Sequence, residues 1–157
     1  MRARVMRSRI MGTSLLEMLL VIALIAALGV LAAAALSGGF AGMQLRSNAK
    51  QIAAQLRYTR TQAIATGRPQ RFTVDPRAHA WTAPNDRRGE IPASLGVRFI
   101  GAREVQPTAG EGAIVFFADG ASTGGRVQLQ AKQTAWNIDV AWLTGEVRMR
   151  RVEVGAP

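Results

Sequence analysis

The chain has 157 residues, a formal net charge of +10 and a hydrophobic content of 48%. This length fits one folded domain preceded by an anchoring segment. The sequence contains no cysteine, which excludes disulfide bonds and thiol chemistry, and its single histidine, His79, leaves little scope for histidine-based sites. Four of the basic residues lie in the first twelve positions, so the net charge falls from +10 to +6 without them: Arg2, Arg4, Arg7 and Arg9.

A long apolar run follows these arginines. Met18 to Leu36 is a stretch of 19 residues without a charge, about the length that spans a hydrocarbon core. A cleaved secretory signal has the same basic start, but its apolar region is only about 7–15 residues long. A signal-anchor helix fits the length better, and the arginines predict a cytoplasmic N-terminus and an exported C-terminal region. Neither interpretation explains Glu17, a carboxylate at the front of the run.

The stretch GTSLLE, from Gly12 to Glu17, resembles the N-terminal signal of type IV prepilins and pseudopilins. This signal is a basic leader ending in Gly, then five residues ending in Glu, then a long apolar helix. The resemblance implies that a prepilin peptidase cuts between Gly12 and Thr13 and methylates the new amine of Thr13. It also implies that Glu17 pairs with the terminal amine of a neighbouring subunit during assembly. The family usually has Phe where this chain has Thr13.

Helical periodicity resumes after Ser37-Gly38-Gly39. Apolar residues at spacings of three, four and seven form a stripe that we expect to be buried in the chain's own domain: Ala49, Ile52, Ala53, Leu56, Ala63 and Ile64. The basic residues on the other faces are expected to be solvated: Arg46, Lys50, Arg57 and Arg60. Gly67 and Pro69 are typical of a helix end. We therefore expect one helix from Thr13 to about Thr66, with residues 13–36 in the membrane and 37–67 in the periplasm.

From Gln70 onward the pattern changes to period two. Seven stretches are expected to form strands: Arg71–Asp75, Ala78–Ala83, Leu95–Gly101, Ala113–Ala118, Arg126–Gln130, Ala135–Leu143 and Gly145–Arg151. The stretch Asn85–Gly89 is expected to be a polar loop. Ala135–Leu143 is the clearest half-buried strand, with Trp136, Ile138, Val140 and Trp142 on its inner face. One long helix and six or seven short strands predict an α+β fold with antiparallel sheets, formed by residues 68–157 behind a leader of residues 1–12.

The stretch FFADGASTGGRVQL, Phe116–Leu129, is the second recognisable motif. It reads as a strand, a turn at Asp119-Gly120 and a bend at Gly124-Gly125 that enters another strand. It resembles the F-x-x-D-G-x-x-x-G-G motif of H-type minor pseudopilins of type II secretion systems and of related minor pilins. The end of the helix, Gln55–Pro69, resembles the same group, whereas residues 78–112 match no motif. We expect Asp119 and the glycines to have a structural role in backbone conformation and turn hydrogen bonding.

No stretch of the sequence has the spacing of a catalytic or metal site. The acidic residues are scattered without the alternation of a calcium loop, and the segment GASTGG lacks the lysine of a phosphate-binding loop. We therefore expect no enzymatic activity, no cofactor and no metal.

The family resemblance implies a structural subunit near the tip of a periplasmic pseudopilus, which takes part in export of folded proteins across the outer membrane. Its implied partners are other major and minor pseudopilins, the prepilin peptidase and membrane lipid, without nucleic acid. The alternative is a minor pilin of a type IV pilus or DNA-uptake system that binds nucleic acid through a basic surface. The arginines that would form that surface are three near the C-terminus, Arg148, Arg150 and Arg151, together with Arg126. Phosphate contacts would make such binding strongly salt-dependent.

Overall fold

The structure, a computed structural model of the full chain, describes residues 14–101 and 110–154, with the side chains of residues 33–39 outside that description. These residues form one helix, α1 (Leu15–Thr66), and eight strands. The chain divides into two compact units, and the boundary in the sequence falls between Gly39 and Phe40. The first unit carries the N-terminal part of α1. The second carries the remainder of α1 and all the described strands.

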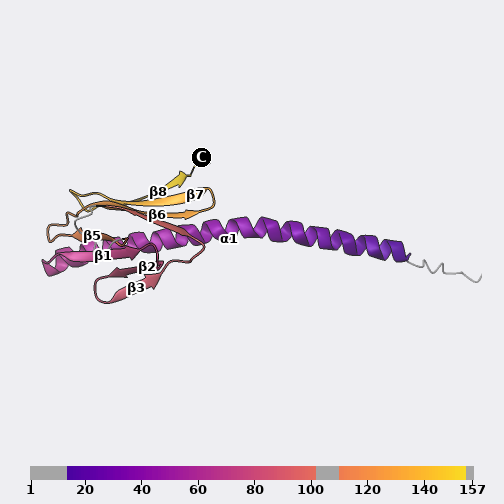
Figure 1. Cartoon of the computed structure of the whole chain (residues 1–157), viewed down its shortest axis with the longest axis horizontal. Helices are drawn as coiled ribbons and strands as arrows, with labels where there is room; N and C mark the ends of the chain where they lie inside the picture. Colours follow the sequence, from indigo (N-terminus) through magenta and orange to yellow (C-terminus); the bar gives the residue numbers. More distant parts are fainter. Residues whose placement is uncertain (1–13, 102–109, 155–157) are drawn as a thin grey trace, which may run out of the picture. The chain divides into compact units, whose positions relative to one another are not determined.

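The strands of the second unit form two antiparallel sheets of four strands each (Figure 1). Sheet A has the order β3-β2-β1-β5, formed by β3 (Arg87–Glu90), β2 (Ala80–Ala83), β1 (Gln70–Asp75) and β5 (Gly112–Phe116). Sheet B has the order β4-β6-β7-β8, formed by β4 (Gly96–Ile100), β6 (Gly125–Ala131), β7 (Thr134–Val140) and β8 (Val147–Glu153). The predicted α+β fold with antiparallel sheets is confirmed.

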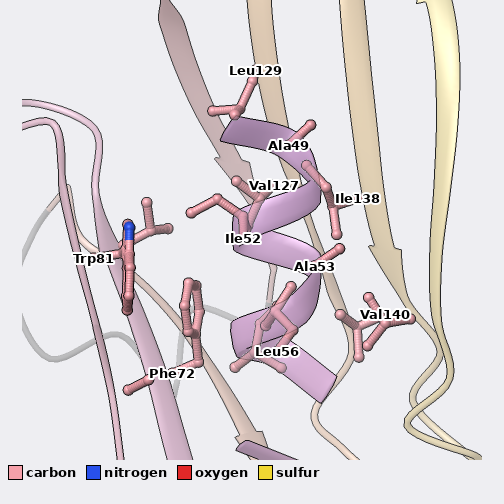
Figure 2. Packing of buried hydrophobic residues seen from close by; sticks show 14 of the residues in the cluster. Ala49, Ile52, Ala53, Leu56, Phe72, Trp81, Val127, Leu129, Ile138 and Val140 are labelled. Carbon is pink, nitrogen blue, oxygen red and sulfur yellow. The ribbon is translucent and has the colours of Figure 1, made fainter. Parts of the chain in front are cut away.

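The core of the second unit forms around one face of α1. The small side chains of Ala49 and Ala53 are fully buried, and they let the sheets approach the helix closely. Figure 2 shows Ile52 and Leu56 of the same face between side chains of the two sheets. Sheet A contributes Phe72 and Trp81, whose rings stack at 6.2 Å between centroids, and sheet B contributes Val127, Leu129, Ile138 and Val140. Burying each of the larger side chains stabilises the fold by about 1.5–3 kcal/mol.

The predicted buried stripe of the helix is confirmed at five of its six positions. Ala49, Ile52, Ala53, Leu56 and Ala63 are buried, but Ile64 is 49% exposed. Ile64 lies in the last turn of α1, which ends two residues later at Thr66. The helix stops there because Gly67 adopts a left-handed conformation (φ 63°), which is the expected role of a glycine just beyond a helix.

The first unit contains an 18-residue stretch of α1, Leu15–Ala32, that is long and apolar enough to cross a membrane. Its large apolar side chains are exposed all along this stretch: Leu15, Leu16, Met18, Leu19, Leu20, Val21, Ile22, Leu24, Ile25, Leu28, Val30 and Leu31. Such a surface is stable when lipid or other apolar helices surround it. This is the N-terminal apolar helix that the sequence predicts.

The expectation of a polar loop at Asn85–Gly89 is wrong, because β3 begins at Arg87. β3 pairs with β2 in antiparallel register, and Gly89 lies opposite Trp81. A Cβ atom at residue 89 would collide with the Trp81 indole ring, so the absence of a side chain makes room for the core tryptophan. The strand has no buried apolar side chain of its own, and the sequence therefore shows no alternation there.

Two other local predictions also need correction. The strand expected at Ala135–Leu143 ends at Val140, and Trp142 is 69% exposed in the turn that follows. His79, expected within a strand, instead lies in the turn before β2 with a φ of 51°. Both residues sit where the chain reverses direction, and a turn interrupts the alternation between inner and outer faces.

Candidate functional site

The N-terminal signal enters the described structure only at Ser14. Gly12 and Thr13, the predicted cleavage and methylation site, lie outside the described residues. Ser14 caps the helix, since its hydroxyl oxygen accepts a hydrogen bond from the Leu16 backbone N–H at 3.3 Å. Glu17 lies in the first turn of α1 and is exposed. A carboxylate in this turn is favoured by the helix dipole, and within residues 14–101 and 110–154 no basic group forms an ion pair with it.

The Asp119-Gly120 pair forms a tight turn after β5. The Asp119 carboxylate accepts a hydrogen bond from the Ala121 backbone N–H at 3.0 Å. The Gly120 N–H donates to the Phe117 carbonyl, and the Phe117 N–H donates to the Ala121 carbonyl, both at 2.9 Å. Gly120 has a φ of 86°, in the left-handed region that side chains rarely adopt. The turn therefore uses both an aspartate side chain and a glycine backbone.

This turn is held against α1 and against the turn between β7 and β8. Arg60 donates its Nε–H to the Gly120 carbonyl oxygen at 3.0 Å. Gly145 approaches so closely that a Cβ atom there would collide with the same carbonyl oxygen. One carbonyl group of the motif is thus in contact with the helix and with the turn between β7 and β8.

The segment from Ser122 to Gly125 connects the two sheets. On one side, Thr123 donates its N–H to the Val115 carbonyl at 2.9 Å, and its Oγ1 accepts the Val115 N–H at 3.1 Å. On the other side, Ser122 donates its N–H to the Trp142 carbonyl at 2.8 Å and its hydroxyl to the Ala141 carbonyl at 3.0 Å. Gly124 (φ 71°) and Gly125 (φ 145°) then turn the chain into β6. These contacts are backbone and hydroxyl contacts without acid–base chemistry.

Sequence reasoning missed the two arginines that join the helix to the sheets. Arg57 is exposed, as expected, and also donates from Nη2 to the Val147 carbonyl at 3.0 Å, whereas Arg60 is half-buried and donates to Gly120. The sequence places them three residues apart, on one side of the helix. Solvated arginines often have the same spacing, so the sequence does not reveal this role. It becomes visible only in the folded structure, where the carbonyl groups of Val147 and Gly120 lie next to the two side chains.

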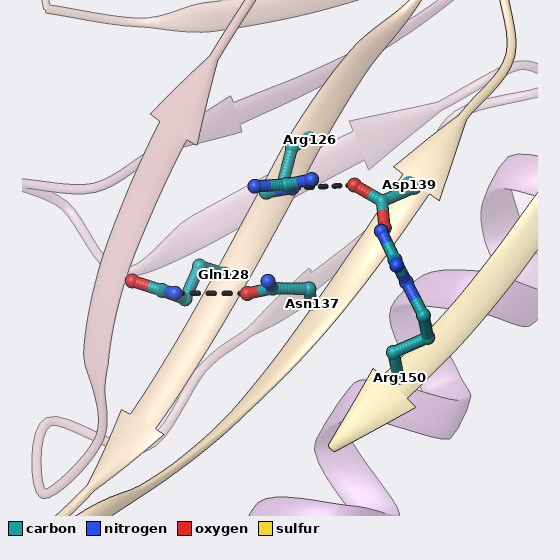
Figure 3. Close-up of polar contacts among 5 residues, drawn as sticks. All are labelled: Arg126, Gln128, Asn137, Asp139 and Arg150. Atoms are coloured by element: carbon teal, nitrogen blue, oxygen red, sulfur yellow. Dashed lines mark hydrogen bonds and ion pairs between the residues drawn. The ribbon is translucent and has the colours of Figure 1, made fainter. Parts of the chain in front are cut away.

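The four arginines expected to form a basic surface do not form one free patch. Arg126 and Arg150 both bind the carboxylate of Asp139, the latter at 2.9 Å, as Figure 3 shows. Arg148 pairs with Glu146 at 2.7 Å. In the β7–β8 register Arg151 lies opposite Trp136, on the other face of the sheet from Arg148 and Arg150. Three of the positive charges are therefore engaged by carboxylates.

The arginines also affect the ionisation of the carboxylates. Partial burial of Asp139 acts to raise its pKa, but the hydrogen bonds from Arg126 and Arg150 outweigh burial and hold the pKa below its ordinary value. The hydrogen bonds from Arg148 lower the pKa of Glu146 in the same way. Both carboxylates are thus kept charged over a wide pH range. Among the described residues, His, Asp and Glu side chains form no group of three that could hold a metal ion.

Comparison with known families shows to which family the chain belongs. A family model described as "Type II transport protein GspH" matches residues 48–145, more than half of the chain. The chain belongs to the GspH family. The match includes the buried helix face, both sheets up to β7 and the whole Asp119–Gly125 segment.

A relative in this family resembles the chain over almost its full length. The protein named "Type II secretion system protein H" from Xanthomonas campestris pv. campestris is 63% identical over 155 residues, which are 99% of this chain and 92% of that protein. The similarity therefore extends beyond the family model to the N-terminal apolar helix.

Solved structures share the fold at much lower sequence identity. The minor pseudopilin EpsH of the Vibrio cholerae type 2 secretion system aligns with a TM-score of 0.53 at 11% identity, covering 72% of this chain and 99% of that one. The type IV minor pilin FimU of Pseudomonas aeruginosa also aligns with a TM-score of 0.53, at 15% identity over 68% of this chain and 87% of that one. The GspH-family chain thus has a pilin-like fold, as predicted.

Proposed function

We propose that this GspH-family protein is a minor pseudopilin, a structural subunit near the tip of the periplasmic pseudopilus of a type II secretion system. In this role it takes part in export of folded proteins across the outer membrane. The observation that carries the proposal is the 63% identity, along almost the whole chain, to a protein named for that system.

The anchor is proposed to be α1 in the inner membrane, with the N-terminus in the cytoplasm and the strands in the periplasm. The basic leader and the apolar stretch Leu15–Ala32 support this orientation, because positively charged flanks remain on the cytoplasmic side. A prepilin peptidase would remove residues 1–12 by cutting between Gly12 and Thr13 and would methylate Thr13. The mature helix would then contact lipid and the helices of other pseudopilins.

Glu17 is proposed to guide assembly. An acidic side chain within a membrane helix costs about 2.5–3.5 kcal/mol on insertion scales, and a partner charge reduces that cost. Cleavage would provide a positive amine at Thr13, four residues from Glu17 and on the same helix face. In a growing filament, the terminal amine of a neighbouring subunit would compete for the same carboxylate and so favour one axial register.

The proposal is tested by measuring the mass of the N-terminal peptide of protein extracted from membranes of cells that make it with its secretion system. We expect a mature chain that begins at Thr13 and is heavier by one methyl group. A chain that begins near Ser37 would indicate an ordinary cleaved signal and would contradict the proposal.

The less supported alternative is a minor pilin that binds nucleic acid. The likeness to FimU concerns the fold alone, and the ion pairs of Arg126, Arg148 and Arg150 leave Arg151 as the one arginine of the expected surface without a carboxylate partner among the described residues. A gel-shift assay with duplex DNA at two salt concentrations distinguishes the two functions. Binding that weakens steeply with salt would support the alternative, and no binding at low salt would remove it.

A further inference from the structure

The two sheets of the second unit have four edges, and they differ in how open they are. β3 and β4 are short edges of four and five residues. β5 is covered by the motif, since Thr123 bonds to Val115 and Ser122 bridges to Phe116. β8 has seven residues and forms the longest edge of the described structure. A long open edge carries unpaired backbone groups that can accept another strand.

The hydrogen bonds at the two ends of the β7–β8 pair show which groups of β8 face outward. Ala141 donates its N–H to the Glu146 carbonyl at 3.0 Å, and Val154 donates to the Gln133 carbonyl at 2.9 Å. Hydrogen-bonded and non-bonded pairs alternate along an antiparallel ladder. The backbone groups of residues 148, 150 and 152 therefore point toward β7, whereas those of 147, 149, 151 and 153 point away from it.

An independent contact agrees with this assignment. The Val147 carbonyl, one of the outward groups, accepts the hydrogen bond from Arg57 Nη2 at 3.0 Å. No described residue bonds to the outward groups of Met149, Arg151 and Glu153. The open part of the edge thus begins after Val147 and provides three N–H donors and three carbonyl acceptors.

The charge along this edge is mainly positive. Arg150 shares Asp139 with Arg126, which leaves two guanidinium groups around one carboxylate (Figure 3). Arg151 is exposed and has no carboxylate within ion-pair distance among the described residues. Antiparallel pairing of two copies centred on Arg151 would set two arginines directly opposite each other, which is destabilising. An acidic strand would meet these charges with favourable pairs.

We propose that the outer edge of β8 binds an extended, acidic segment of a different pilin-like subunit as an added strand, with Met149 and Arg151 providing the backbone pairing. This inference rests on the proposed function, because it assigns one contact surface within the same assembly. The outward backbone groups supply affinity in such strand addition, and the arginines select an acidic partner.

The test uses the full-length, tagged protein in cells that contain its secretion system, followed by recovery of partner subunits from detergent-solubilised membranes. Arg151→Pro removes an outward N–H but none of the β7–β8 hydrogen bonds, and proline is tolerated at such edge positions. Arg151→Glu keeps the backbone and reverses the charge. Each change should lower recovery of the partner by about tenfold or more, a difference of roughly 1.4 kcal/mol.

Two control variants accompany these changes. Arg151→Lys keeps the charge and should recover the partner within about twofold of wild type. Arg88→Glu makes the same charge reversal on the exposed edge strand β3 and should leave recovery unchanged. If Arg151→Pro fails to fold, as judged by protease resistance, Arg151→Glu decides the question.

The possible outcomes separate this inference from the proposed function. Wild-type recovery of the partner by Arg151→Glu overturns the strand-addition site and leaves the pseudopilin assignment intact. Recovery of a second copy of this chain in place of a different subunit also overturns it. If the wild-type protein recovers no pilin-like subunit at all, the proposed function itself fails.

Discussion

Arg60 donates a hydrogen bond at 3.0 Å to the carbonyl oxygen of Gly120, a residue 60 positions later in the sequence. The contact joins α1 to the Asp119-Gly120 turn within the folded second unit. The turn presents its carbonyl group to the guanidinium of Arg60, which gives a motif without catalytic residues a structural role.

Replacing Arg60 by Ala should destabilise the second unit. The carbonyl of Gly120 would lose a charged donor while Gly145 still shields it, and hydrogen bonds to charged groups contribute about 1.5–3 kcal/mol. Thermal unfolding of the full chain in detergent should show a transition several degrees lower. Arg46→Ala, an exposed residue of the same helix, is the matched control and should change stability by less than about 0.5 kcal/mol. Equal transitions for the two variants would contradict a role for the contact.

Replacing Gly145 by Ala should destabilise the second unit for two reasons. The residue has a φ of 62°, and the new Cβ would collide with the Gly120 carbonyl oxygen. Strained backbone positions cost about 1–3 kcal/mol each, and the collision adds to this. Denaturant unfolding should give Gly145→Ala a clearly lower free energy of unfolding than wild type. Gly42→Ala is the control, because Gly42 lies in the helix with open space around it, and alanine there should stabilise by about 0.5–1 kcal/mol.

The ion pairs of Asp139 should make the stability of sheet B depend on pH. The folded pKa of Asp139 is depressed relative to the unfolded chain, whose ordinary value is about 3.9. The stabilisation is therefore complete above about pH 4 and is lost as the pH falls through the folded pKa. Unfolding measured across this range should show a steeper acid decline for wild type than for Asp139→Asn. Parallel curves would mean that Arg126 and Arg150 do not stabilise the charged form.

Replacing Glu17 by Ala should separate insertion from assembly. The apolar stretch Leu15–Ala32 remains intact, so the variant should still enter the membrane and lose its leader. Incorporation into pseudopili should fall, because the partner for a neighbouring amine is absent. Glu17→Asp keeps the charge on a shorter side chain and is the control. The mass of the N-terminal peptide and the amount of the variant in purified filaments are the measurements, and normal secretion by Glu17→Ala would count against the role.

The sequence was sufficient to predict the fold where burial follows a regular period. The helix face from Ala49 to Ala63 and the inner-face residues Ile138 and Val140 were predicted from spacing alone, and all are buried. β3 was missed because both of its faces are largely exposed, so its residues show no alternation of apolar and polar side chains. Trp142 was wrongly expected on the inner face of the strand. The alternation of larger apolar residues with other residues continues to Trp142 in the sequence, although the strand ends at Val140 and the chain turns there.

The functional site was only partly predictable for a similar reason. The spacing of Gly12 and Glu17 and the D-G-x-x-x-G-G pattern are local, so they can be read directly from the sequence. The partners of Arg57 and Arg60 are backbone carbonyl groups 90 and 60 residues away. Every residue has a backbone carbonyl, so the sequence does not show which of them accept these hydrogen bonds. The ion pairs around Asp139 likewise depend on the register of three strands.

The two helix arginines have a mechanical consequence. Arg57 holds the start of β8 and Arg60 holds the turn that follows β5, so the last turns of α1 are attached to both sheets. An axial force on this part of the helix would load those attachments and the packing around Ile52 and Leu56 at the same time. Sliding of the helix would require them to rupture together rather than one after another. The second unit is therefore built to resist shear along its helix.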